Sequence, residues 1–81
     1  MKLPRDVSGD NLARCLIKLG YKQTKQTGSH MRFSTNINGE HSITIPKHQE
    51  LKIGTLNNIL NDVAEHLNMS KQELIHALWD S

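Results

Sequence analysis

The sequence contains a single cysteine, Cys15, among its 81 residues. One thiol cannot form an internal disulfide, and a cysteine-based metal site is excluded as well. Chains of this composition suit a reducing compartment. No stretch approaches the roughly 20 apolar residues of a membrane-spanning helix, and the N-terminus lacks the apolar run of a signal peptide. We therefore expect a cytoplasmic protein that does not associate with membranes.

The chain is also short. Its 81 residues are enough for one domain, so we expect residues 1–81 to form a single domain. A domain of this size buries only about 60% of the surface that its unfolded chain exposes, which leaves a thin core. Such a core has no room for a deep substrate cavity. If the protein is an enzyme, its substrate is expected to lie across the surface, and a polymer fits that geometry better than a small metabolite.

The net charge is only +2, but it is unevenly distributed. Residues 1–52 hold nine Lys/Arg and four Asp/Glu, a net charge of +5. Residues 53–81 hold one Lys and four Asp/Glu, a net charge of −3. A basic first part is compatible with a polyanionic partner such as a nucleic acid. Ordinary surface charge explains the same numbers, so the charge pattern alone leaves both interpretations open.

Apolar spacing predicts a first helix over residues 8–19. Ser8 is a suitable N-cap, and Gly20 stands where a C-terminal glycine stop is expected. Cys15 falls within the apolar stripe of this helix, which favours a small buried hydrophobe over a nucleophile. The stripe, which follows the i, i+3, i+4, i+7 pattern, consists of Leu12, Cys15, Leu16 and Leu19.

Two further helices are predicted in the last third of the chain. The second is expected to start near Gly54 and Thr55, with Thr55 as its cap. Ser70 and Glu73 have the spacing of a capping box, which would open a short third helix. The apolar stripe of the second helix consists of Leu56, Ile59, Leu60, Val63 and Leu67.

Three strands are expected between the first two helices. Residues 21–26 are polar and make a weak edge-strand candidate, whereas residues 30–35 and 41–45 can form a hairpin. A two-residue Asn-Gly turn would put the apolar residues of the two hairpin strands on opposite faces. A three-residue loop, residues 37–39 with Gly39 left-handed, puts them on one face, so burial selects this register. It pairs Phe33 with Ile43 and Met31 with Ile45, and it gathers His30, Arg32, Ser34, Ser42 and Thr44 on the polar face.

The predicted order is therefore α-β-β-β-α-α. Each long helix has one apolar face, and so does the sheet. The simplest arrangement is an α+β two-layer sandwich, with both long helices on one face of a three-stranded antiparallel sheet. The other face of the sheet, which carries His30, is expected to face solvent.

The sequence Gly28-Ser29-His30 is the sharpest local signal for chemistry. Gly28 permits a backbone shape that lets a phosphate approach the main chain, and His30 can accept and return a proton near neutral pH. RNA carries its own nucleophile, the 2′-hydroxyl, so its cleavage needs a base, an acid and a cation but no metal. From spacing alone, a surface histidine without a role remains the commoner explanation. The basic residues available to His30 are Lys25, Arg32 and Lys47.

A metal site made of His30, His41 and His48 is a second idea, and the spacing disfavours it. The chosen register places His41 on the opposite face of the sheet from His30. We therefore expect no metal and no other cofactor. His66 and His76 flank the helical stripes and are expected to be solvated surface residues.

Five short motifs occur along the chain in a particular order and spacing. They are LPRDVSG at residues 3–9, LIKLGY at 16–21, GSH at 28–30, ITIPKH at 43–48, and LKIGTL at 51–56 followed by Ile59-Leu60. Each motif is weak alone, but the set resembles HicA-type toxins over nearly the whole chain. The resemblance implies a double-stranded-RNA-binding-like α-β-β-β-α fold, to which the short C-terminal helix would be an addition.

The resemblance also implies a function. HicA-type toxins are endoribonucleases (mRNA interferases), and a HicB-type antitoxin neutralises them, so RNA and such an antitoxin are the expected partners. The family's active-site histidine falls on His30. One departure is Met31, which stands where the family often has a second histidine, but our register makes it a core residue. The expected substrate-binding residues around His30 are Gly28, Ser29, Lys25, Arg32 and Lys47.

Two other functions remain open from the residues. The same fold could serve as a non-catalytic RNA-binding module, which would use basic residues at a helix start and in loops. The second predicted helix begins Lys52-Ile53-Gly54-Thr55, with one basic residue, and this weakens that alternative. The protein could instead bind only another protein, although the polar face of the sheet argues mildly against it.

Overall fold

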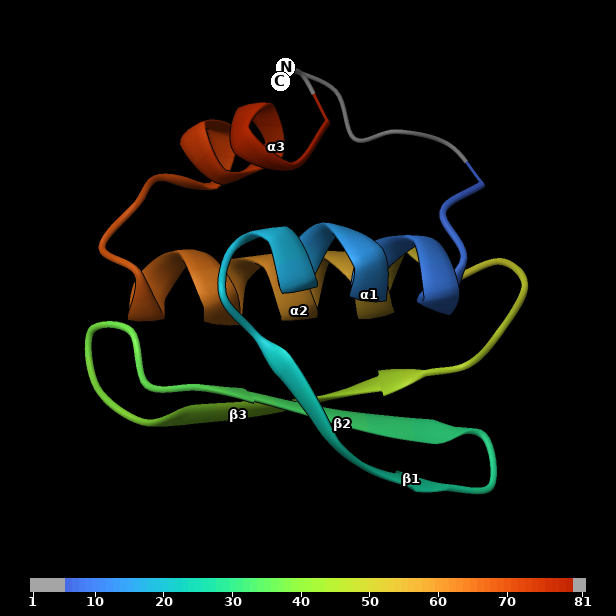
Figure 1. Cartoon of the computed structure of the whole chain (residues 1–81). Coiled ribbons are helices and arrows are strands. Elements are labelled where there is room, and N and C mark those ends of the chain that lie inside the picture. Colours follow the sequence, from blue (N-terminus) through green and yellow to red (C-terminus); the bar gives the residue numbers. More distant parts are fainter. Residues whose placement is uncertain (1–5, 80–81) are drawn as a thin grey trace.

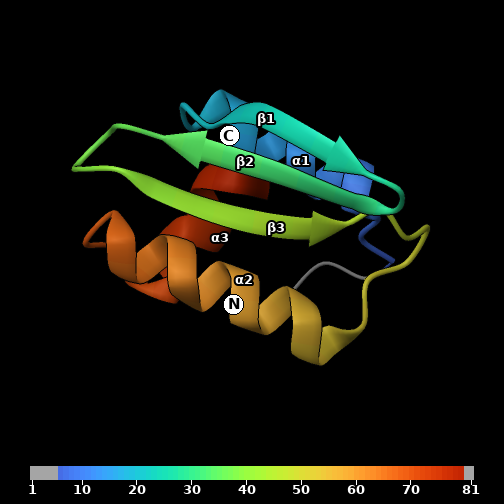
Figure 2. The ribbon, with the colours of Figure 1, turned by 90° about the horizontal axis from the view of Figure 1, so that it is seen from below.

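The computed structural model describes residues 6–79 and confirms the predicted α+β fold. Three strands form one antiparallel sheet in the order β1-β2-β3, and helices α1 and α2 both lie on one face of it (Figure 1). The opposite face of the sheet is open, as the view from below shows (Figure 2). The elements are α1 (Gly9–Lys18), β1 (Lys22–Thr27), β2 (His30–Thr35), β3 (His41–Pro46), α2 (Ile53–His66) and α3 (Lys71–Trp79).

Helix α1 has Ser8 as its N-cap, as predicted. The Ser8 hydroxyl accepts a hydrogen bond from the N–H of Asn11 at 2.9 Å, which satisfies one of the free donors of the first turn. Gly9 is needed because a Cβ at this position would lie 2.1 Å from the carbonyl oxygen of Pro46. The Gly9 N–H also donates to the carbonyl of His48 at 2.9 Å. The start of α1 is thereby fixed against the end of β3.

Strands β2 and β3 pair in the predicted register. The buried pairs that define it are Met31 with Ile45 and Phe33 with Ile43. Burial of these side chains, and not the Asn-Gly pair, therefore decides the connection. The loop of residues 36–40 contains two residues with left-handed backbone conformation, Asn38 (φ 58°) and Gly39 (φ 99°), whereas only Gly39 was expected to be left-handed.

Strand β1 is the exposed edge strand that the sequence predicts, but it also contains a β-bulge. Its pairing with β2 shifts by one residue between Gln23 and Lys25, so Thr24 is the extra residue. One extra residue reverses the face that the following side chains take. Lys25 and Thr27 consequently point to the open face, whereas an unbroken strand would turn them toward the helices.

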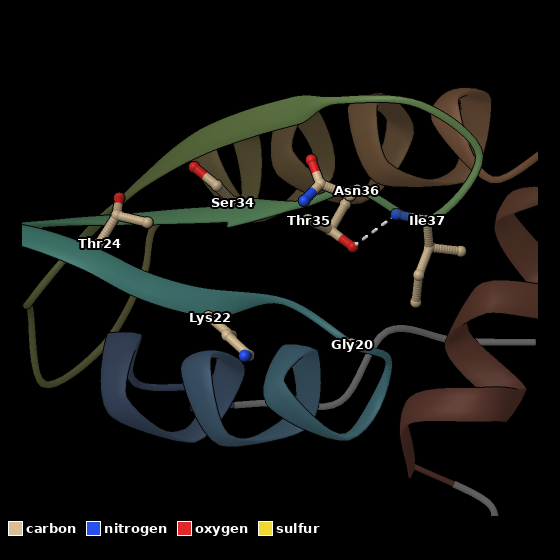
Figure 3. A pocket seen from close by; sticks show the side chains of 7 residues that line it. All are labelled: Gly20, Lys22, Thr24, Ser34, Thr35, Asn36 and Ile37. Carbon is tan, nitrogen blue, oxygen red and sulfur yellow. Dashed lines mark hydrogen bonds between the residues drawn. The ribbon is translucent and has the colours of Figure 1, made fainter.

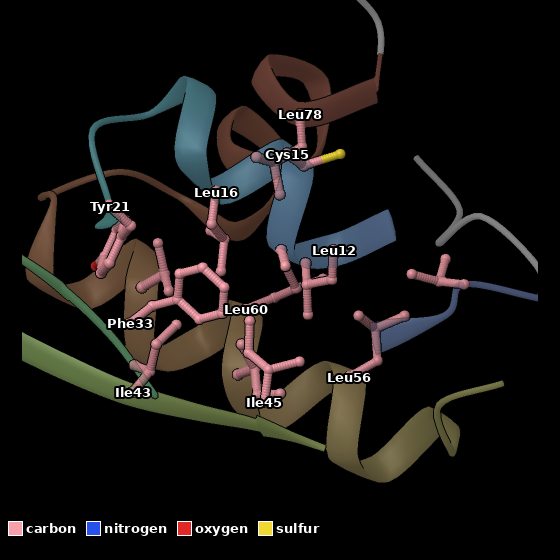
Figure 4. Close-up of a cluster of buried hydrophobic side chains, with 14 of the residues drawn as sticks. Leu12, Cys15, Leu16, Tyr21, Phe33, Ile43, Ile45, Leu56, Leu60 and Leu78 are labelled. Atoms are coloured by element: carbon pink, nitrogen blue, oxygen red, sulfur yellow. The ribbon is translucent and has the colours of Figure 1, made fainter. Parts of the chain in front are cut away.

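The hydrophobic core lies between the sheet and helices α1 and α2, and it continues between these helices and α3 (Figure 4). Tyr21 and Phe33 are its largest members, and each is only 1% exposed. Cys15 is buried as predicted, and burial raises the pKa of its thiol, which suits packing rather than reactivity. The other side chains that are almost completely buried are Leu12, Leu16, Ile45, Leu56, Leu60, Val63 and Leu74.

Helix α2 begins earlier than predicted. Its first residue is Ile53, preceded by Lys52, whose side chain makes no capping hydrogen bond. The predicted Thr55 cap is therefore wrong, because Thr55 already lies inside the helix. Packing of the apolar stripe, which includes Leu56 and Leu60, stabilises this helix start without a side-chain cap.

Helix α3 begins with the predicted capping box. The N–H of Glu73 donates to the Ser70 hydroxyl at 3.0 Å, and the N–H of Ser70 donates to the Glu73 carboxylate at 2.8 Å. The helix packs against α1 and α2, on the side of the helical layer away from the sheet (Figure 1). None of the helices within residues 6–79 is long and apolar enough to cross a membrane.

Candidate functional site

The open face of the sheet presents three rows of side chains, each row running across the three strands from β1 to β3. Directly opposed residues share a face, so the pairing fixes every row. The face carries three cations, one histidine, four hydroxyl groups and one proline. The rows are Thr27, His30 and Pro46; then Lys25, Arg32 and Thr44; then Lys22, Ser34 and Ser42.

His30 follows a tight turn between β1 and β2. Thr27 pairs with His30, so Gly28 and Ser29 are the two central residues of the turn. Gly28 has φ +57° while Ser29 has no positive φ, a pattern that fits a type II′ turn. A Cβ at Gly28 would meet nothing within 4 Å, so the backbone conformation, and not crowding, calls for glycine here.

The side chain of His30 is exposed and borders a shallow hollow of about 190 Å³. Lys25 and Arg32, two of the predicted basic residues, border the same hollow. Two hydroxyl groups complete it, from Thr27 and Thr44. The structure thus brings together an imidazole, two cations and hydroxyl groups in one shallow hollow, which is the geometry expected for a polymeric substrate.

Lys47 is placed differently from the other predicted site residues. Its N–H donates to the carbonyl of Ser29 at 2.6 Å, so its backbone is attached to the turn before His30. Its side chain borders a separate hollow of about 380 Å³ with Asp10 and His48, beside the start of α1. Lys47 therefore neighbours the His30 hollow but does not line it.

The bulge at Thr24 is the feature of this site that sequence reasoning missed. It is the reason why Lys25 shares the hollow with His30 and Arg32. The segment Lys22–Thr27 reads KQTKQT, and all six residues are exposed. A strand with no apolar alternation gives no signal for its register, so neither the bulge nor the face of Lys25 could be inferred from it.

A second group of polar side chains lies at the other end of the sheet, on the helix side. The Asp62 carboxylate can only accept, so Nε2–H of His41 donates to it at 3.1 Å. The hydroxyl of Tyr21 is hydrogen-bonded to Nδ1 of the same ring at 2.8 Å. Burial, with a further contribution from Asp62, raises the pKa of Tyr21 to about 12.

His66 joins this group, so its prediction as a solvated surface residue is wrong. Its ring stacks on that of His41, with 4.3 Å between the ring centroids. Its Nε2–H donates to the carbonyls of Ile37 and Gly39 at 2.9 and 3.0 Å. The side chain thereby attaches α2 to the loop between β2 and β3.

A larger hollow, about 470 Å³, lies away from His30 (Figure 3). Lys22, Ser34 and Thr35, at the opposite ends of β1 and β2, line it together with the loop residue Ile37. Thr35 accepts the N–H of Ile37 at 3.1 Å, which orders the start of the loop. This hollow contains no residue of the predicted site.

The predicted separation of His41 from His30 is also confirmed, since the two lie on opposite faces of the sheet. Within residues 6–79, no group of three or more His, Cys, Asp or Glu side chains is arranged to hold a metal ion.

Comparison with known protein families gives a match. The model of a protein family described as HicA toxin of bacterial toxin-antitoxin matches residues 9–64. The matched region includes every predicted site residue and ends before α3. No curated protein and no solved structure matches the chain.

Proposed function

Because the chain belongs to the HicA toxin family of bacterial toxin-antitoxin systems, we propose that it is an endoribonuclease that cleaves messenger RNA. The observation that carries this proposal is the exposed His30 beside Lys25 and Arg32 in one shallow hollow. The family also implies a HicB-type antitoxin as the partner of this toxin. The match over residues 9–64 includes the hollow but does not itself identify the reaction.

The hollow supports a transesterification within the RNA. His30 takes the proton of a 2′-hydroxyl as its oxygen forms a bond to the adjacent phosphorus. Lys25 and Arg32 offset the negative charge that grows on the phosphorane oxygens. The bond from phosphorus to the 5′-oxygen breaks, and that oxygen takes up a proton, for which protonated His30 and Lys25 are the available acids. The products are a 2′,3′-cyclic phosphate and a 5′-hydroxyl.

The backbone at the Gly28-Ser29 turn and the Lys47 side chain are assigned to substrate binding. Gly28 leaves the main chain open to a phosphate, since nothing lies within 4 Å of the place where a Cβ would be. The backbone N–H of Lys47 is hydrogen-bonded to the turn, and Lys47 lines the neighbouring hollow. We assign it to a phosphate beyond the one that reacts.

The second candidate is an RNA-binding module without activity, and the structure offers it less support. The start of α2 has Lys52 as its only basic residue. Within residues 6–79 the open face presents no Phe, Tyr or Trp side chain on which bases could stack, since Tyr21 and Phe33 are in the core and Trp79 is in α3.

Cleavage of end-labelled RNA by the purified protein, with and without EDTA, tests the proposal. We expect cleavage that survives EDTA and products that end in a 2′,3′-cyclic or 3′-phosphate, because the 2′-hydroxyl is the nucleophile. A strict requirement for a divalent ion together with 3′-hydroxyl products would overturn the mechanism. RNA binding without any cleavage would favour the second candidate.

A further inference from the structure

We infer that the open face binds RNA in one orientation, with the backbone along β1 and one base placed between β3 and α2, where Asn58 reads it. This deepens the proposed ribonuclease function and rests on it. It assigns a base-binding site next to the His30 hollow and names the kind of base that fits, one with an exocyclic amino group.

The first observation is the distribution of charge across the open face. Strand β1 places Lys22, Lys25 and Thr27 on this face, and the central strand β2 adds Arg32, so the positive charges lie on β1 and β2. The positions contributed by β3 are uncharged, namely Ser42, Thr44 and Pro46. Phosphates are attracted to Lys and Arg, so the RNA backbone is expected on the β1 side. The bases then point across β2 toward β3.

The second observation is a hollow of about 320 Å³ at the place where those bases would arrive. Arg32 and Thr44 line both this hollow and the smaller one that contains His30, so the two hollows adjoin. Rows on the face repeat about every two strand residues, roughly 6.6 Å, which is close to one nucleotide of backbone. A base in this hollow therefore belongs to a nucleotide next to the cleaved bond.

The lining of this hollow suits a base edge. Asn58 is exposed on α2 and offers a side-chain amide that can donate and accept at once. Asp62 lies in the same lining, and one of its oxygens is bonded to His41, which leaves the other free to accept. Ile43 and Ile59 supply apolar contact for the face of the ring.

The acceptors decide which bases fit. Adenine pairs well with Asn because its amino group donates while a ring nitrogen accepts. Asp62 adds a second acceptor for an amino group, which adenine, cytosine and guanine all carry. Uracil has a carbonyl oxygen in place of the amino group of cytosine, which would leave the Asp62 oxygen opposite another acceptor. We therefore expect bases with an exocyclic amino group to be preferred over uracil.

Binding of RNA that cannot be cleaved tests this site separately from catalysis. The probes are 2′-O-methyl hexamers of uridine in which one position is adenine, cytosine, uracil or purine, which is adenine without its amino group. Fluorescence anisotropy measures their dissociation constants. We expect adenine to bind at least about fivefold more tightly than uracil and purine, the lower end of what one bidentate pair provides.

Three variants show which residues read the base. Asn58→Ala should strongly reduce the preference, because the Asp62 oxygen alone cannot form the bidentate pair. Asn61→Ala is the matched control on the same helix, because Asn61 is exposed and lies outside the hollow, and it should keep the preference. Lys22→Ala should weaken binding of all probes equally. It should also reduce the slope of the logarithm of the binding constant against the logarithm of the salt concentration by about the contribution of one phosphate contact.

The outcomes separate this site from the nuclease proposal. Equal binding of all probes, or a preference that Asn58→Ala leaves unchanged, would overturn the base site even if the protein cleaves RNA. A preference that depends on Asn58 in a protein that does not cleave RNA would support the base site and refute the nuclease. If Asn58→Ala weakens binding only to a partner protein, the hollow is a protein contact and the inference is wrong.

Discussion

At the scale of single residues, the properties of His30 come from its position. It lies immediately after a two-residue turn, on the face of the sheet away from the core, with Lys25 and Arg32 beside it. Its replacement therefore leaves no cavity in the core, and effects on chemistry and on folding can be measured separately.

We expect His30→Ala to reduce the rate of RNA cleavage by about 10²- to 10⁴-fold, the usual contribution of a general acid-base group. The thermal unfolding midpoint should change little, because the side chain is exposed. His48→Ala is the matched control, since the contact of His48 with Gly9 uses its backbone carbonyl. Cleavage by His30→Ala at the wild-type rate would show that His30 is not catalytic.

Tyr21 gives a prediction about high pH. Burial raises its pKa to about 12, above the usual value near 10, and the negative charge of Asp62 adds to the shift. The neutral phenol therefore stabilises the fold fully below pH 10, and this contribution is lost as the pH rises through 12. Tyr21 is the only tyrosine, so the absorbance of tyrosinate reports on it alone.

The titration midpoint should lie near 12 in the folded protein and near 10 in urea. Asp62→Asn should lower the midpoint of the folded protein only partly, because burial is the larger cause. A midpoint near 10 while circular dichroism still shows the native fold would contradict the buried environment of Tyr21.

At the scale of the elements, the accuracy of the sequence predictions follows the distribution of apolar residues. Met31 and Phe33 in β2 have to be buried with their partners in β3, which is why the register of that hairpin could be predicted. The stripe of α1 and the capping box of α3 were equally clear in the sequence.

Where apolar residues are missing, the sequence supported no prediction or a wrong one. The polar strand Lys22–Thr27 gives no sign of the bulge at Thr24. Thr55 has the chemistry of a cap, but packing extends α2 back to Ile53. His66 binds the carbonyls of a loop far away in the sequence, and local spacing contains no information about such a contact. The face of the sheet on which Lys25 lies and the contacts of His66 could therefore be determined only from the tertiary structure.

The capping box of α3 gives a prediction at this scale. Ser70→Ala removes the hydroxyl that accepts the Glu73 N–H, and we expect a loss of roughly 0.5–2 kcal/mol in the free energy of unfolding. The backbone N–H of Ser70, and to a smaller extent its hydroxyl, lower the pKa of Glu73, so the stabilisation that the Glu73 carboxylate contributes is present above the unfolded pKa and is lost as the pH falls through the folded one.

Chemical denaturation at neutral and at acidic pH measures this effect. Ser70→Ala keeps the Ser70 N–H, so it removes only the hydroxyl's part of the interaction with the Glu73 carboxylate, and the difference in stability between the wild type and Ser70→Ala should be slightly smaller in acid, where that carboxylate is protonated. Thr55→Ala is the control, because Thr55 does not cap α2 and its replacement should cost less. An equal loss from both variants would mean that the capping box does not stabilise α3.

At the scale of the whole molecule, residues 6–79 provide no lid over the proposed active site and no buried pocket within it. Its hollow is shallow and borders the open face of the sheet, with Lys25, Arg32 and His30 exposed. A toxin of this shape cannot be silenced by closing a cavity. Its antitoxin, the partner that the family implies, would have to prevent RNA from reaching the open face.

We therefore predict that the antitoxin covers the His30 face with acidic side chains. Carboxylates that contact Arg32 and Lys47 would replace the phosphates of RNA, and opposite charges would steer the two proteins together. Association should slow as salt is added, because screening acts mainly on the encounter of exposed charges. Stopped-flow association at several salt concentrations measures this dependence.

Hydrogen exchange on the complex should show protection of residues 28–32, which are exposed in the free protein apart from Met31. Protection confined to α2 and α3, with residues 28–32 exchanging as in the free toxin, would rule out occlusion and would indicate an inhibitor that acts at a distance.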